Sequence, residues 1–191
     1  HLGVTPETIA TKMAQLEPVA MRLEVKEGHN NCMIINDSYN SDTASLDIAL
    51  DFMERRCKTM PNLKRTLILA DIKQTGEKAQ SLYSNVIGCL KEHKIEKFIG
   101  IGNDILSQAQ LFHATGMECH FFTNTEELIA SPAIKSLQNE CILIKGSRSF
   151  HFEDVTEVLE KKVHQTILEV NLSALRDNLN HYRSNLKSGV K

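Results

Sequence analysis

The residue types best suited to chemistry stand together, directly after a short apolar segment. Residues 32–35 are Cys-Met-Ile-Ile, and residues 36–42 are Asn-Asp-Ser-Tyr-Asn-Ser-Asp, followed at once by an amphipathic helical pattern. In open α/β sheets, ligands bind at the carboxyl ends of strands, where the next helix also directs its unpaired N–H groups. The segment is therefore predicted to place an acid, hydroxyls and amides at a ligand site.

Three further polar segments follow predicted strands, at residues 71–76, 102–104 and 145–149. The carboxyl ends of parallel strands point the same way, so these segments are expected to meet residues 37–42 at one edge of the sheet. Solvation of ordinary loops is the alternative explanation for such polarity. Residues 37–42 go beyond that alternative, because an aromatic ring and amides accompany the acid.

The Lys-Gly-Ser-Arg-Ser segment at residues 145–149 could hold an anion. Its glycine permits close backbone approach, its hydroxyls can donate, and Arg148 can bind a carboxylate through two parallel hydrogen bonds. A solvated turn is the alternative. Residues 100–103, Gly-Ile-Gly-Asn, lack the third glycine of a dinucleotide-binding fingerprint and are interpreted as a turn. Asp71 could equally be a helix cap or an acid that supports the ligand-binding residues from behind.

Several kinds of site and partner are not expected. The sequence contains no G-x-x-x-x-G-K-[ST] phosphate loop, and His29 with Cys32 has no second pair of metal ligands, so no metal site is predicted. A net charge of −2 gives no electrostatic reason to expect nucleic acid. No apolar run is long enough for a membrane span, and the N-terminus does not resemble a secretory signal. The five cysteines, without a C-x-x-C pair, are interpreted as reduced core thiols of a cytoplasmic protein.

The apolar pattern predicts the elements that must position these loops. After a short helix that is expected to stop at Pro18, two strands form a hairpin through the turn at residues 28–31, and strands then alternate with amphipathic helices. Such alternation predicts a three-layer α/β fold with a mostly parallel, Rossmann-like sheet and helices on both faces. The expected strands are residues 21–26, 32–36, 66–70, 97–101, 118–122 and 141–144. A helix with Leu46, Ala49, Leu50 and Met53 on one face is expected after the second strand, and the expected later helices are residues 79–90, 105–112, 125–130 and 151–163.

A further strand and helix follow this sheet. Residues 167–170 are apolar, and Leu172, Leu175, Leu179, Tyr182 and Leu186 form a helical stripe. Because the sheet is already covered, we expect this unit to open another domain. The chain starts at His1 and ends in mid-pattern at Lys191, so we expect it to be a piece of a longer protein.

Three segments resemble the C-terminal domain of the Mur ligases, the ATP-dependent amino-acid-adding enzymes of peptidoglycan synthesis. They are Pro-Val-Ala-Met-Arg-Leu-Glu at residues 18–24, Ile-Asn-Asp-Ser-Tyr-Asn at residues 35–40 and Ile-Lys-Gly-Ser-Arg-Ser at residues 144–149. The Asp-Ser-Tyr-Asn form is similar to members that add D-alanyl-D-alanine to UDP-N-acetylmuramoyl-tripeptide. The resemblance implies that residues 1–20 end a central ATPase domain and that residues 21–164 form the C-terminal domain.

The resemblance also implies roles for individual residues. A central domain binds the ATP phosphates and Mg²⁺ and phosphorylates the tripeptide carboxylate, the dipeptide amine attacks the acyl phosphate, and the C-terminal domain closes over the site. The family pattern usually continues Asn-Ala-Asn-Pro, whereas Ser41-Asp42-Thr43 follows Asn40 here, which leaves the roles of Ser41 and Asp42 open. By motif, the catalytic Arg22 would contact the ATP phosphates, and Asp37 would accept from the ribose hydroxyls. The dipeptide would lie against Tyr39, Asn40 and Ser41, and its carboxylate would lie near Lys145, Ser147 and Arg148.

The tail resembles another family. Residues 166–179, Thr-Ile-Leu-Glu-Val-Asn-Leu-Ser-Ala-Leu-Arg-Asp-Asn-Leu, are similar to the opening of alanine racemase, a pyridoxal phosphate enzyme. Residues 165–191 would then start a racemase domain whose cofactor lysine lies beyond Lys191, in a bifunctional parent that makes D-alanine and consumes it. Two alternatives remain: a stand-alone α/β module that binds a nucleotide or small acid without catalysis, and a structural linker between two enzymes.

Overall fold

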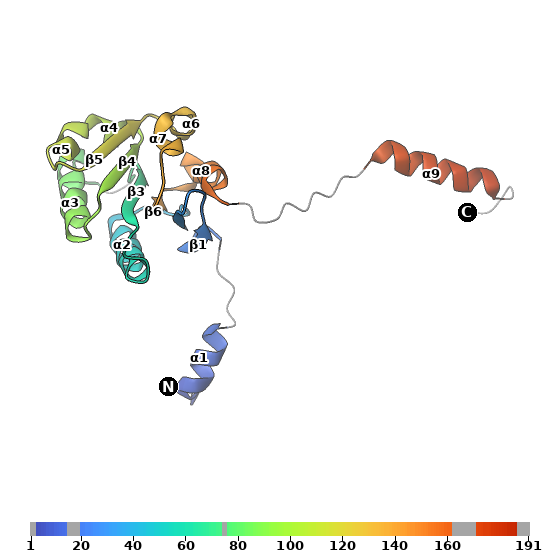
Figure 1. Ribbon diagram of the computed structural model, residues 1–191, viewed down its shortest axis with the longest axis horizontal. Coiled ribbons are helices and arrows are strands. Elements are labelled where there is room, and N and C mark those ends of the chain that lie inside the picture. Colours follow the sequence, from blue (N-terminus) through green and yellow to red (C-terminus); the bar gives the residue numbers. More distant parts are fainter. Residues whose placement is uncertain (1–2, 15–19, 74–75, 162–170, 187–191) are drawn as a thin grey trace. The chain divides into compact units, whose positions relative to one another are not determined.

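The computed structural model describes residues 3–14, 20–73, 76–161 and 171–186, and the chain divides into two compact units, His1–Lys161 and Lys162–Lys191 (Figure 1). The first unit contains a six-stranded sheet with the order β1-β2-β6-β3-β4-β5. Only β1 is antiparallel to its neighbour, so the prediction of a mostly parallel α/β sheet is confirmed. The strands are β1 (Glu24–Glu27), β2 (Met33–Asp37), β3 (Lys64–Ala70), β4 (Lys97–Ile101), β5 (Glu118–Phe122) and β6 (Glu140–Lys145).

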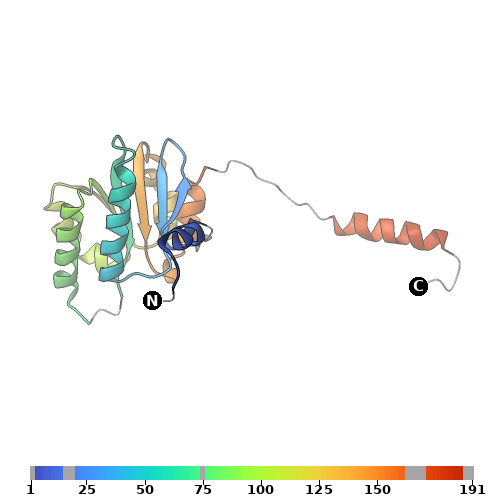
Figure 2. The ribbon, with the colours of Figure 1, turned by 90° about the horizontal axis from the view of Figure 1, so that it is seen from below.

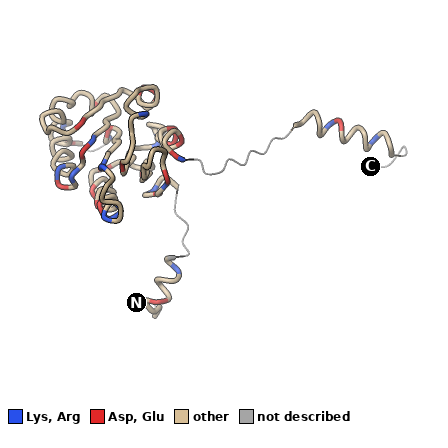
Figure 3. Tube along the Cα trace, viewed as in Figure 1, with Lys and Arg blue, Asp and Glu red and all other residues tan. Residues whose placement is uncertain are grey.

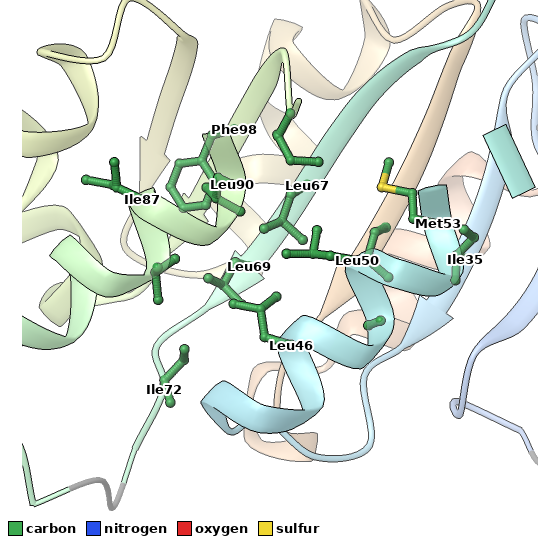
Figure 4. Packing of buried hydrophobic residues seen from close by; sticks show 14 of the residues in the cluster. Ile35, Leu46, Leu50, Met53, Leu67, Leu69, Ile72, Ile87, Leu90 and Phe98 are labelled. Atoms are coloured by element: carbon green, nitrogen blue, oxygen red, sulfur yellow. The ribbon is translucent and has the colours of Figure 1, made fainter. Parts of the chain in front are cut away.

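Helices cover both faces of the sheet (Figures 1 and 2). Successive strand side chains point to opposite faces, so each strand contributes to two cores. Ile35 and Leu67 pack with Leu46 and Leu50 of one helical layer (Figure 4), whereas Ile34 and its equivalents pack with the other layer. The first layer consists of α2 (Thr43–Cys57), α3 (Ala79–Glu92), α4 (Asn103–Ser107) and α5 (Ala109–His113), and the second of α6 (Thr125–Ala130), α7 (Pro132–Lys135) and α8 (Phe152–Leu159).

The predicted hairpin is present, with a shorter first strand. Asn30 and Asn31 have φ values of 53° and 59°, and the N–H of Cys32 donates to the carbonyl of His29 at 3.0 Å, the pattern of a tight hairpin turn. The strand predicted from residue 21 begins at Glu24 instead. Met21 and Leu23 have φ values of 60° and 48°, which an extended strand does not allow.

Three helices differ from their predictions. The helix expected at residues 105–112 is divided at Gln108 into α4 and α5, and α7 was not predicted. The helix expected to reach residue 163 ends at Leu159, because the next residue, Glu160, pairs with Gly28 as an isolated antiparallel bridge. Val163 and the predicted strand at residues 167–170 lie outside the described residues.

The remaining described helices are α1 (Pro6–Ala14) and α9 (Leu172–Asn185). The Thr5 hydroxyl accepts from the N–H of Thr8 at the start of α1, and the expected stop at Pro18 lies outside the described residues. Within its own unit, α9 leaves its predicted apolar stripe exposed. None of the described helices combines the length and the apolar character that a bilayer crossing requires. Acidic and basic residues are interspersed along the chain (Figure 3). All five cysteines are free thiols, but only Cys32, Cys57 and Cys141 are buried as core thiols, whereas Cys89 and Cys119 are partly exposed.

Candidate functional site

The sheet forms a natural binding crevice where β2 and β6 end. The chain leaves β2 toward α2 on one face, and it leaves β6 toward η1 (Arg148–Phe150) and α8 on the other face. Because adjacent parallel strands send their connections to opposite faces, the two connections separate at the carboxyl edge. This is a topological switch point, the place where open α/β sheets bind ligands.

A buried ion pair joins the two strands at this edge. Asp37 and Lys145 are partners in the β2–β6 register, and the Lys145 ammonium donates to Asp37 Oδ2 at 2.7 Å and to the carbonyl of Asn40 at 2.7 Å. The side chains are only 1% and 14% exposed for Lys145 and Asp37, respectively. An ammonium so far from water requires such partners. Lys145 therefore holds the loop after β2 against β6.

Two guanidinium groups lie over the ring of Tyr39. Arg22 precedes β1 and Arg148 follows β6, yet the central carbon of each guanidinium is 4.3 Å from the centroid of the Tyr39 ring. These are cation–π distances, and all three side chains are exposed. The arrangement concentrates positive charge on a solvent-accessible aromatic platform, beside the loop that Lys145 holds.

The rest of the loop caps the N-terminus of α2. Asp42 accepts from the N–H of Ser45 at 2.8 Å, and the Ser45 hydroxyl approaches the N–H of Asp42 at 3.3 Å, which together form a capping box. The Ser45 N–H is the main reason that the pKa of Asp42 lies below its ordinary value, and the charge of Lys145 contributes. Asp42 thus starts α2 without the proline of the family pattern. Ser41 is buried, and its hydroxyl has no hydrogen-bond partner in the part of the chain that the structure describes.

The loop after β6 lies close to α8. A Cβ on Gly146 would come within 2.6 Å of the Phe152 ring, so only glycine allows this approach. The hydroxyls of Ser147 and Ser149 are 2.9 Å apart and bond to each other. Arg148 is exposed at the start of η1, and so it remains available for an anion.

The two polar segments after β3 and β4 form a structural unit. The Asp71 carboxylate accepts from the N–H groups of Asp104 and Ile105, at 3.2 and 2.9 Å, and so caps α4. Burial raises the pKa of Asp71. A Cβ on Gly102, whose φ is 120°, would lie 2.3 Å from the Asp71 carboxylate. These contacts agree with the cap alternative for Asp71 and with the turn interpretation of residues 100–103.

The structure thus brings most of the predicted site residues to one edge. What sequence reasoning missed is how they contact each other: the Tyr39 platform and the Asp37–Lys145 pair. The pair could have been found from the sequence only with the strand order, because both residues end their strands. Their ligand-binding roles stay predictions. The residues that meet are Arg22, Asp37, Tyr39, Asn40, Lys145 and Arg148, with Ser41 buried within the same loop and Ser147 bonded to Ser149.

Comparison with known proteins assigns the family. Residues 21–148, more than half of the chain, match the family described as Mur ligase, glutamate ligase domain. The chain belongs to the Mur ligase family. This Mur ligase domain is 27% identical over 161 residues to the UDP-N-acetylmuramoyl-tripeptide–D-alanyl-D-alanine ligase of Escherichia coli (strain K12), covering 84% of this chain and 34% of the relative. The enzyme of the same name from Bacillus subtilis (strain 168) is 23% identical over 161 residues, covering 83% and 35%.

Solved structures support the fold. A crystal structure of MurF from Acinetobacter baumannii superposes on this Mur ligase domain with a TM-score of 0.61 and 23% identity, over 82% of this chain and 34% of that one. A murein peptide ligase from Psychrobacter arcticus 273-4 has a TM-score of 0.52 at 10% identity, over 82% and 32%. The chain spans about a third of the length of the curated relatives it matches.

Proposed function

We propose that this domain is the C-terminal, substrate-closing part of an ATP-dependent ligase that adds D-alanyl-D-alanine to UDP-N-acetylmuramoyl-tripeptide. The names of its curated relatives support this substrate pair. The observation that carries the proposal is the assembly of Arg22, Tyr39 and Arg148 beside the Asp37–Lys145 pair. It provides cations where negatively charged substrates would lie, at the edge where such sheets bind ligands.

The proposed role of Arg22 is to stabilise the charge that develops on the ATP phosphates during phosphoryl transfer. Its guanidinium is exposed and lies over the Tyr39 ring, so it can reorient toward a phosphate. Asp37 uses Oδ2 for Lys145, which leaves Oδ1 to accept from a ribose hydroxyl. In this proposal the phosphates and Mg²⁺ are bound mainly by a central domain, and residues 1–20 are the last part of that domain.

The dipeptide is proposed to lie along the loop after β2, against Tyr39, Asn40 and Ser41. Arg148 can bind its carboxylate with two hydrogen bonds, because a guanidinium matches that geometry, and Ser147 lies next to it. Lys145 is buried and already bonded to two oxygens, so it would act from behind, through its charge and by fixing the loop.

We propose further that residues 21–164 form the ligase domain and residues 165–191 open an alanine racemase domain of a bifunctional parent. The exposed apolar side chains of α9 support this, because such a stripe normally packs against other elements. Pyridoxal phosphate would bind beyond this chain. An assay of alanine racemisation in the full-length parent tests the proposal, and absence of that activity would refute the racemase part alone.

Substitutions in the full-length parent test the ligase proposal. Arg22→Ala should lower the rate of ligation about 100-fold, the usual loss when one charge-stabilising donor is removed. Asp37→Asn should raise the KM for ATP, because it keeps the shape of the side chain but replaces the carboxylate that would accept from the ribose hydroxyls with an amide. Arg55→Ala is the matched control, because Arg55 is an exposed α2 residue whose ion pair with Asp51, at 3.8 Å, lies outside the candidate site. Wild-type ligation kinetics in both site variants would remove the assignment.

Calorimetry separates this proposal from a stand-alone binding module. The 191-residue chain alone should bind ATP and D-alanyl-D-alanine weakly, because most of the ATP contacts would come from the central domain. Tight binding of either compound by the chain, together with unaffected ligation in the parent variants, would favour the binding module. If replacing residues 37–42 leaves ligation intact, the domain is a linker.

A further inference from the structure

A second group of chemically capable side chains lies between α2 and α3, and none of them belongs to the ligase site. Asp47, Asp51 and Glu54 occupy positions i, i+4 and i+7 of α2, so they share one side of that helix. They face Cys89 in the last turn of α3 and His93 at its C-cap. A thiol, an imidazole and a carboxylate from two helices are thereby brought together.

The donor atoms of three of these residues already have the spacing of a metal site. Asp47 Oδ1 lies 3.3 Å from Cys89 Sγ and 3.5 Å from His93 Nε2, and the three donor atoms all lie within 4.8 Å of one another. A tetrahedral zinc ion with bonds of about 2.0–2.3 Å holds its ligand atoms about 3.3–3.6 Å apart. Little movement is therefore needed to close the three donors around one ion.

The other ring nitrogen of His93 provides an independent observation. Nδ1 is buried and has no hydrogen-bond partner among the described residues, although Glu54 Oε2 is only 3.5 Å away. Histidines that bind a metal through one nitrogen usually donate the other N–H to a carboxylate. An ion on Nε2 would place the proton on Nδ1, facing Glu54, and would give the buried nitrogen its partner.

The surroundings also suit a cation. Asp51 and Glu92 add negative charge nearby, whereas the guanidinium of Arg65 donates to the carbonyl of His93 at 2.6 Å and fixes the end of α3. The Cys89 thiol donates to Asp47 Oδ1, so a metal ion would replace a proton that now lies between two of its ligands.

We propose that Asp47, Cys89 and His93 form a zinc site that joins α2 to α3, with water as the fourth ligand and Glu54 orienting His93. Thiolate, imidazole and carboxylate donors together favour Zn²⁺ over Mg²⁺, which prefers oxygen ligands alone. Binding forms an S–Zn bond and releases the Cys89 thiol proton to solvent, without oxidation or reduction. The site goes beyond the proposed ligase function. It departs from the sequence-based expectation of no metal, because its ligands come from two different helices, with Asp47 and Cys89 lying 42 residues apart in the sequence.

Titration of the reduced 191-residue chain with Co²⁺ and Zn²⁺, in excess Mg²⁺, tests the site. Wild type should bind one equivalent, develop a thiolate-to-cobalt charge-transfer band and release one proton. Cys89→Ser should abolish the band and weaken Zn²⁺ binding more than tenfold, and Glu54→Gln should weaken it about tenfold. Cys119→Ser is the matched control, because it removes another half-buried thiol from β5 and should leave every signal unchanged.

Asp47→Asn protects the test against misfolding, since the Asp47 side chain is 63% exposed and its loss should not disturb the core. This variant should also lose most of its Zn²⁺ affinity while its thermal unfolding midpoint without metal stays near that of wild type. A charge-transfer band that persists in both Cys89→Ser and Asp47→Asn, or wild-type Co²⁺ binding that excess Mg²⁺ eliminates, would overturn the proposal.

Discussion

At the scale of single residues, Lys145 connects the fold to the site. Its ammonium is bonded to Asp37 and to the carbonyl of Asn40, and its side chain is 1% exposed. The same contacts position the loop that carries Tyr39, on which Arg22 and Arg148 stack. A substitution here should therefore affect both stability and the geometry of the site.

Lys145→Met should lower the free energy of unfolding by about 3 kcal/mol, because it leaves the Asp37 carboxylate largely buried without its cation. The matched control is Lys161→Met, which removes an exposed pair with Glu27 at 2.8 Å and should cost less than about 1 kcal/mol. Urea unfolding measures both. Equal losses in the two variants would mean that the Lys145 pair is not structural.

At the scale of elements, a helix cap sets the start of α2, and a single glycine sets the path of the loop after β6. Asp42 starts α2 through a capping box, and Gly146 lets the chain pass over Phe152 before α8. Both lie next to predicted ligand-binding residues, so the ends of these elements set the shape of the site.

Asp42→Ala should lower the free energy of unfolding by about 1 kcal/mol at neutral pH, the usual cost of losing an N-cap. Since the folded-state pKa of Asp42 lies below its ordinary value of 3.8, its contribution is complete above that value and is lost as the pH falls through the folded-state pKa. The difference between wild type and variant should therefore shrink below about pH 4, as measured by urea unfolding across pH. A constant difference down to pH 2 contradicts this account.

Gly146→Ala should lower the free energy of unfolding by about 1–3 kcal/mol, because the added methyl meets the Phe152 ring at 2.6 Å in a packed core. The paired control is Gly88→Ala. A Cβ at Gly88, inside α3, meets nothing within 4 Å, so alanine should stabilise the helix by about 0.5–1 kcal/mol. Thermal unfolding of both variants gives the sign of each effect, and the same sign in both would refute the packing argument.

At the scale of the whole chain, the described residues that form the two hydrophobic cores on either side of the sheet all belong to the first compact unit. In the second unit, the structure describes α9, and the leucines of this helix are exposed. The topology of the sheet, with β6 between β2 and β3, places the candidate site at the carboxyl edge of the first unit.

Removal of residues 162–191 should change the free energy of unfolding of the remaining domain by less than about 0.5 kcal/mol, because none of the described residues of that segment belongs to either buried core cluster. Urea unfolding followed by circular dichroism measures the comparison. A large loss of stability on truncation would show that the tail contributes to this fold.

Much of the fold could be predicted because apolar segments and their polar boundaries are local features. The segments Lys97–Ile101, Glu118–Phe122 and Thr125–Ala130 begin and end where the sequence predicted. The errors arose where backbone conformation overrode the pattern: the alternation at Met21 and Leu23 suggested a strand, but both residues adopt positive φ. The helix after β4 divides at Gln108, a break without a local glycine or proline signal.

The sequence by itself determined the α/β class, the polar loop at residues 37–42 and the resemblance to Mur ligases, because these depend on side-chain types and short-range order. Only the tertiary structure decided which strands are neighbours. That order pairs Asp37 with Lys145 across 108 positions and brings Arg22 and Arg148 to the same tyrosine. Contacts of this range arise from the packing of the sheet between its two helical layers, which no local pattern specifies.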